Sequence, residues 1–160
     1  MERRRVLTGI GLVLAGMLPG CSGDTNSTGP TDAVERYFEA LADGDREAAN
    51  QVAHTDGEFY IDDDAHPFLE AENLTITETE TVDIEQAVES MFAEPEEVHI
   101  EDVVENEEAA VEKTQNDHGF TDFEYVRHDA SADGLTFNSV YLLFESDDNW
   151  VLWSLPTAHM

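Results

Sequence analysis

Residues 33–49 read AVERYFEALADGDREAA, and this stretch decides how the folded part of the chain is built. Its large apolar residues recur at the spacing i, i+3, i+4 and i+7: Val34, Tyr37, Phe38 and Leu41. That spacing predicts an amphipathic helix, which Gly44 ends. Asp45 can cap a second, shorter helix. Because so few residues join the two, they are expected to form a tight antiparallel hairpin.

Most of the chain after residue 73 has the residue pattern that is typical of strands. Alternating or β-branched stretches, expected to be strands, are 74–84, 98–104, 109–115, 123–128, 135–145 and 150–155. Polar turns at 105–107, 129–134 and 147–149 would join them, residues 85–92 would form a short helix, and 55–72 would be mostly loop. The predicted class is α+β, with the helix hairpin packed on one side of a curved antiparallel sheet of about five to six strands.

The helix hairpin and a last strand that reads WVLWS over 150–154 resemble the nuclear-transport-factor-2-like superfamily, which includes ketosteroid-isomerase-like enzymes. The resemblance covers most of residues 31–155. It implies a cone-like domain, in which the sheet wraps the helices around a space for a small ligand. The residues expected to line this cone are Tyr37, Phe38, Phe137, Tyr141 and Trp153. The superfamily also contains dehydratases and members without catalysis, so the fold alone does not decide the function.

Residues 1–20 have the plan of a secretory signal peptide, with a basic start and an apolar stretch that ends near Leu18. The apolar stretch is too short to cross about 30 Å of hydrocarbon as a helix. Arg3 and Arg4, followed after one residue by Val-Leu, resemble the twin-arginine export signal.

Residues 18–21, Leu-Pro-Gly-Cys, resemble the lipobox of prokaryotic lipoproteins, in which a diacylglyceryl group is attached to the cysteine thiol. Cys21 is the only cysteine and a small polar stretch follows it at once, which favours lipidation over an incidental cysteine. The protein is therefore expected at the extracytoplasmic face of the cell membrane, anchored by lipid. The expected organisation is a signal peptide over 1–20, a lipidated tether over 21–30 and one folded domain over 31–160.

The charge of the chain is strongly negative, with seven Lys and Arg against 37 Asp and Glu. Removing residues 1–20, which hold three arginines and one glutamate, changes the net charge from −30 to −32. Such a surface repels nucleic acid and anionic lipid headgroups. Its self-repulsion is relieved where salt shortens the Debye length to about 3 Å. The acids are interleaved with apolar residues, unlike an acidic tail, so the chain resembles halophilic archaeal lipoproteins.

No catalytic residue can be assigned from the sequence. Candidate proton donors and acceptors are Tyr37, Tyr60, Tyr125, Tyr141, Asp62, His66 and His99. With this many acids, none can be aligned to a catalytic position of the superfamily. The six histidines form no i, i+4 pair on a predicted helix and no cysteine is available to help them, so no metal site is predicted. The sequence has no phosphate-binding loop and no Rossmann fingerprint, and no cofactor is predicted.

Two further motifs carry weaker signals. Residues 129–134 match the first half of a calcium-binding loop, but Val140 stands where a bidentate Glu is required, which favours a plain hairpin turn. Asn26 and Asn73 stand in glycosylation sequons.

The sequence thus predicts an exported, lipid-anchored surface protein whose domain binds a small ligand or an envelope partner without catalysis. Two alternatives stay open. One is an isomerase- or dehydratase-like enzyme that uses a carboxylate in the cone, and the other is a structural component of the envelope.

Overall fold

Four antiparallel strands form one open sheet in the computed structural model, which describes residues 29–62, 74–95, 98–132 and 135–156. The elements are α1 (Pro30–Ala42), α2 (Arg46–Asn50), β1 (Thr75–Val82), α3 (Ile84–Glu89), α4 (Ile100–His118), β2 (Asp122–Ala132), β3 (Leu135–Ser146) and β4 (Asn149–Ser154). The strands are ordered β1-β2-β3-β4, so each pairs with its neighbour in sequence. The predicted α+β class is confirmed. None of the described helices is long and apolar enough to cross a lipid bilayer.

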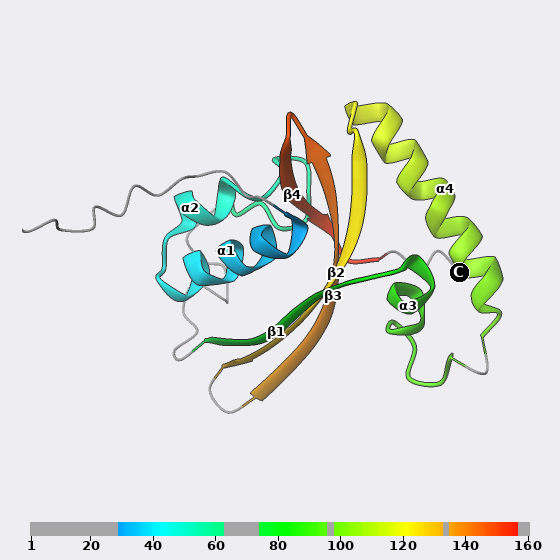
Figure 1. The fold of residues 1–160 in the computed structure, drawn as a ribbon, viewed down its shortest axis with the longest axis horizontal. Coiled ribbons are helices and arrows are strands. Elements are labelled where there is room, and N and C mark those ends of the chain that lie inside the picture. The colour runs from blue at the N-terminus through cyan, green and yellow to red at the C-terminus, as the bar shows by residue number, and fades with distance from the viewer. Residues whose placement is uncertain (1–28, 63–73, 96–97, 133–134, 157–160) are drawn as a thin grey trace, which may run out of the picture.

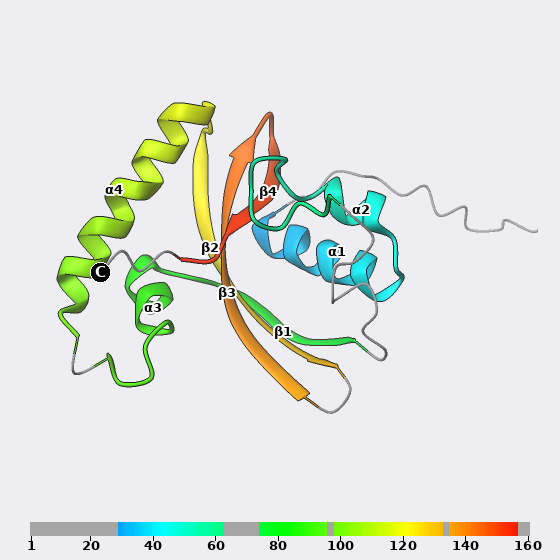
Figure 2. The same cartoon turned by 180° about the vertical axis from the view of Figure 1, so that it is seen from behind.

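Helices cover both faces of the sheet, as Figures 1 and 2 show from opposite sides: α1 and α2 lie on one face, α3 and α4 on the other. Successive side chains of a strand point to opposite faces. On β3, for example, Tyr141 and Leu143 join the core under α1, while Leu142 and Phe144 join the core under α4. The prediction that the helix hairpin covers one side of the sheet is confirmed, and the second helical layer was not predicted.

The core between α1 and the sheet is filled with aromatic side chains. The Tyr37 hydroxyl donates a hydrogen bond to the Phe59 carbonyl at 2.9 Å. The ring of Phe38 lies 4.3 Å from that of His128, nearly parallel to it, and 5.6 Å from that of Tyr141. Side chains from α1 and from the strands therefore pack directly on one another on this face.

The predicted hairpin over 98–104 and 109–115 is wrong, because residues 100–118 form helix α4. Val103, Glu107 and Val111 are its buried residues, at the spacing i, i+4, i+8 of one helix face. Gly119 ends the helix in the left-handed conformation, with a φ of 73°. The described sheet consequently has four strands.

The segment that follows α2 lies along the outer edge of β4, beside which Figures 1 and 2 both draw it. Backbone hydrogen bonds join the two, from Leu152 to Val52 at 2.8 Å, from His54 to Leu152 at 3.0 Å and from Glu58 to Trp153 at 2.7 Å. A Cβ atom on Gly57 would lie 2.8 Å from the Trp153 carbonyl oxygen, so this close approach requires glycine. The segment is thereby held against the sheet edge.

Candidate functional site

The residues predicted to line a cone do not line one common space. Tyr37, Phe38 and Tyr141 lie in the core under α1, whereas Trp153 packs on the opposite face, against Phe144. Phe137 is 37% exposed. The predicted lipidation, export and glycosylation residues lie outside the described part of the chain: Cys21, Arg3, Arg4, Asn26 and Asn73.

A cavity of about 210 Å³ lies between α4 and the sheet, beside the segment that follows α2. Its lining combines three acidic side chains with apolar and hydroxyl-bearing ones: Asp56, Glu58, Glu107, Ala110, Val111, Thr114, Leu142, Trp153 and Ser154. The register of β4 against β3 shifts by one residue at Trp153, since Leu152 pairs with Leu143 and Ser154 with Leu142. This β-bulge allows two successive residues of β4 to reach the same cavity.

The carboxyl group of Glu107 lies on the α4 side of this cavity and is almost completely buried, with 1% of the residue exposed. It accepts a 2.7 Å hydrogen bond from the hydroxyl of Tyr125 on β2. Burial raises the pKa of Tyr125, and the hydrogen bond to Glu107 raises it further. The tyrosine therefore stays protonated as the donor, and an acid and a phenol meet beside a cavity.

Glu107 was not among the candidates named from the sequence, although a signal for it exists. It stands at the same spacing as Val103 and Val111, so a helical interpretation of this stretch places a carboxylate in the middle of an apolar face. Charged residues are rarely fully buried unless they have a partner, and such a position therefore points to a polar contact.

His54, Asp56 and His118 form a cluster at the rim of the cavity, to which Asp56 also belongs. One ligand-type atom from each residue lies within 4.8 Å of the other two. A carboxylate oxygen of Asp56 is 4.0 Å from His54 Nδ1 and 3.8 Å from His118 Nδ1. The histidine side chains are 24% and 29% exposed and that of Asp56 is 66% exposed, so solvent reaches the cluster from one side.

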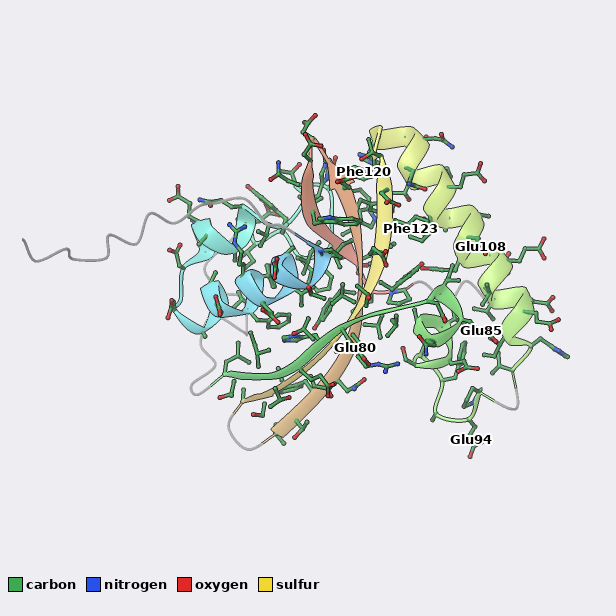
Figure 3. The ribbon with its side chains drawn as sticks, viewed as in Figure 1. Glu80, Glu85, Glu94, Glu108, Phe120 and Phe123 are labelled. Carbon is green, nitrogen blue, oxygen red and sulfur yellow. The ribbon has the colours of Figure 1, made fainter. Side chains whose placement is uncertain are left out.

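Aromatic rings hold the two imidazoles in place. The Trp153 ring lies 5.1 Å from that of His54 and 4.7 Å from that of His118. Phe120, labelled in Figure 3 just beyond the end of α4, stacks on His118 at 5.5 Å. Desolvation lowers the pKa of His54, the nearby His118 lowers it further, and Asp56 opposes both. His54 is accordingly held toward its neutral form, which is the form that binds metals.

Sequence spacing could not reveal this cluster. His54 and His118 stand far apart in the chain, and they meet because one follows α2 while the other ends α4. A search for i, i+4 pairs detects only ligands that share one helix. The prediction of no metal site depends on this spacing and on the lack of further cysteines, and neither bears on histidines that distant segments bring together.

A larger groove, of about 670 Å³, lies between α3 and the N-terminal half of α4. Figure 3 labels two of the acids that line it, Glu85 on α3 and Glu108 on α4. Two more, Glu101 and Asp102, stand in the first turn of α4, where negative charge stabilises the helix dipole. Helix stability thus accounts for part of this acidity without a ligand.

Comparison of the chain with known protein families, with curated proteins and with solved structures found no match. Arguments about function consequently depend on the geometry of the site.

Proposed function

We propose that the chain is an exported, lipid-anchored surface protein whose domain binds a small organic cation in the cavity between α4 and the sheet. The observation that carries this proposal is the lining of the cavity, which combines the acidic Asp56, Glu58 and Glu107 with the apolar Ala110, Val111, Leu142 and Trp153. Ligand sites typically combine apolar walls with a few polar groups that orient the ligand. The net charge of −30 concentrates cations near the surface and repels anions, nucleic acid included.

The place of action follows from the leader and from Cys21. A lipid on this cysteine would hold the domain at the extracytoplasmic face of the membrane, with the predicted tether of residues 21–30 between the lipid and the domain. The resemblance to the nuclear-transport-factor-2-like superfamily, with its cone around a ligand, stays a prediction. It depends on the helix hairpin and the last aromatic strand, and the α4 cavity would take the place of the cone's interior.

Benzylammonium is a suitable probe of the cavity, because it joins a small apolar ring to a positive charge. In molar KCl, we expect it to perturb the NMR resonances of the cavity residues, and neutral benzyl alcohol to bind more weakly. Glu107→Gln should weaken benzylammonium binding about tenfold, which equals 1.4 kcal/mol. Glu108→Gln is the matched control, since the neighbouring Glu108 lines the other groove. Equal binding by both variants, or no perturbation at all, would refute the cavity proposal.

The anchor is tested separately by Cys21→Ser. We expect this variant to be released from the membrane or to remain as uncleaved precursor, because the acceptor of the lipid is gone. Membrane association that still requires detergent in the variant would rule out lipidation at this residue.

A proton-transfer enzyme is the second candidate, favoured by the contact between Glu107 and Tyr125. An isomerase or dehydratase needs a carboxylate as base and a neutral donor near one cavity. Deuterium exchange into cyclohexanone in D₂O, faster than in buffer and lost in Glu107→Gln, would select this candidate. A structural envelope component is expected to show neither exchange nor probe binding.

A further inference from the structure

We propose that His54, Asp56 and His118 bind a divalent transition-metal ion. Ligand atoms around a tetrahedral ion, at about 2.1 Å from it, lie about 3.4 Å from one another. Here the Asp56 carboxylate is already 3.8 Å and 4.0 Å from the two imidazole nitrogens. All three ligand atoms lie within 4.8 Å of one another, so side-chain rotations that bring them closer together would complete the arrangement.

The donor set selects the kind of ion. Two imidazoles and one carboxylate suit Zn²⁺, Fe²⁺, Co²⁺, Ni²⁺ and Cu²⁺, whereas Ca²⁺ and Mg²⁺ prefer sites made of oxygen ligands. Three protein ligands leave at least one coordination position for water or another ligand. Because Asp56 also lines the cavity, a molecule in the cavity would lie close to that position.

The two imidazoles are positioned before an ion arrives. The backbone N–H of His54 donates to the Leu152 carbonyl at 3.0 Å, which holds this residue against β4. His118 is the last residue of α4, directly before the Gly119 cap, and its ring packs on Trp153. Little conformational freedom would be lost by these rings on binding, which favours affinity.

One existing contact would change. The backbone N–H of Asp56 donates to His54 Nδ1 at 3.1 Å, so coordination through this nitrogen would replace that hydrogen bond. Since Asp56 is well exposed, water can satisfy the released amide. An ion would then connect the segment after α2 to the end of α4, across the edge of the sheet.

Co²⁺ is the probe of choice, because its visible absorption reports coordination geometry. The mature chain carrying Cys21→Ser would be titrated in molar KCl, which suppresses loose attraction of cations by the acidic surface. We expect one Co²⁺ per chain, displaced by Zn²⁺ and not by equal Mg²⁺. His54→Ala and His118→Ala should each lower the affinity for Co²⁺ at least about tenfold. His99→Ala, an exposed histidine beside the other groove, is the matched control.

Trp153 supplies a second measurement, as Cu²⁺ bound next to its ring should quench its fluorescence. Trp150 packs in the core under α1, so Trp150→Phe isolates the signal of Trp153. Co²⁺ affinity and quenching that stay the same in both histidine variants would overturn the proposal, as would displacement by equal Mg²⁺.

The metal proposal is distinguishable from the proposed ligand site, because Asp56 is the only one of the three proposed metal ligands that also lines the cavity. Glu107→Gln should retain Co²⁺ binding and lose benzylammonium binding. His118→Ala should lose Co²⁺ binding and retain benzylammonium binding. Circular dichroism of each variant checks that it is folded. If a histidine variant unfolds, Zn²⁺-induced shifts of the His54 and His118 imidazole ¹⁵N resonances in the unsubstituted domain decide the question, and unchanged resonances would refute the proposal.

Discussion

His128 is a polar residue buried in an apolar environment. It is 2% exposed, on the face of β2 that packs under α1, and its ring stacks on Phe38. Thr79 Oγ1 lies 3.4 Å from its Nδ1, and its Nε2 has no hydrogen-bond partner among the described residues. Desolvation lowers the pKa of His128 to about 4, although the Asp129 carboxylate opposes the shift. The folded protein therefore holds this histidine neutral.

This shift predicts a pH-dependent contribution to stability. The pKa of His128 is about 4 in the folded state against 6.5 when unperturbed, so the unfolded chain binds the extra proton first. The stability from keeping the ring neutral is complete above pH 6.5 and is lost as the pH falls toward 4, by up to about 3 kcal/mol.

His128→Phe keeps an aromatic ring on Phe38 and removes the titration. Denaturant unfolding of both proteins between pH 6.5 and pH 4 should show the variant gaining stability relative to the original as the pH falls. The comparison cancels the protonation of the surface acids, which relieves repulsion and acts in the opposite direction. Parallel stability curves for the two proteins would contradict the assigned pKa.

At the scale of elements, the contact between β4 and the segment after α2 matters most, since it places both His54 and Asp56. Asn50 holds the far end of that segment: its side-chain amide donates to the Ile61 carbonyl at 3.0 Å and accepts from the Ile61 N–H at 2.9 Å. Gly57 permits the close approach in the middle. The segment is thus fixed at several points rather than by burial alone.

Gly57→Ala should therefore damage both stability and the metal cluster. The new methyl group would lie 2.8 Å from one backbone carbonyl oxygen and 3.2 Å from two others, and backbone atoms cannot move away cheaply. We expect a loss of about 1–3 kcal/mol in the free energy of unfolding, together with weaker Co²⁺ binding. Gly29→Ala is the control, since its Cβ would meet only the Asp32 carboxylate, at an ordinary 3.9 Å. Equal effects of the two substitutions in denaturant unfolding would contradict the close-approach argument.

The elements also show where sequence patterns succeed. Helices α1, α2 and α3 and all four strands stand close to where apolar spacing, β-branched and aromatic content and turn residues predicted them. Helix α4 was mistaken for a hairpin. Its valines favoured strands, and Glu107 interrupted the apolar face that would have revealed the helical period. The His54–Asp56–His118 cluster depends on contacts between distant segments, which no local pattern encodes.

The whole molecule is dominated by its charge of −30. Two of its ion pairs, Glu80 with Arg127 at 2.8 Å and Asp117 with Lys113 at 2.7 Å, lie at exposed positions, where an ion pair contributes little. Repulsion among the remaining acids opposes the compact state, and salt screens it. The packing of helices on both faces of the sheet must offset the repulsion that salt does not screen.

Removal of salt should therefore destabilise the fold. We expect the thermal midpoint, followed by circular dichroism, to fall as KCl is lowered from molar concentration, and the helical signal to diminish in dilute buffer. Sucrose at the same osmolality should restore the midpoint less than KCl does, because it stabilises folded proteins by exclusion from their surface but screens no charge. An unchanged midpoint with and without salt would argue against halophilic adaptation.

The contact between the segment after α2 and β4 also determines when, during synthesis, the fold can be completed. Synthesis runs from the N-terminus, so residues 52–58 leave the ribosome long before residues 149–154, the edge to which they bind. Until β4 has been made, the edge that holds His54 and Asp56 is absent. On the proposed twin-arginine route, which carries folded cargo, the domain would leave the cytoplasm with this edge already closed. Its first metal ion would then be one that the cytoplasm supplies.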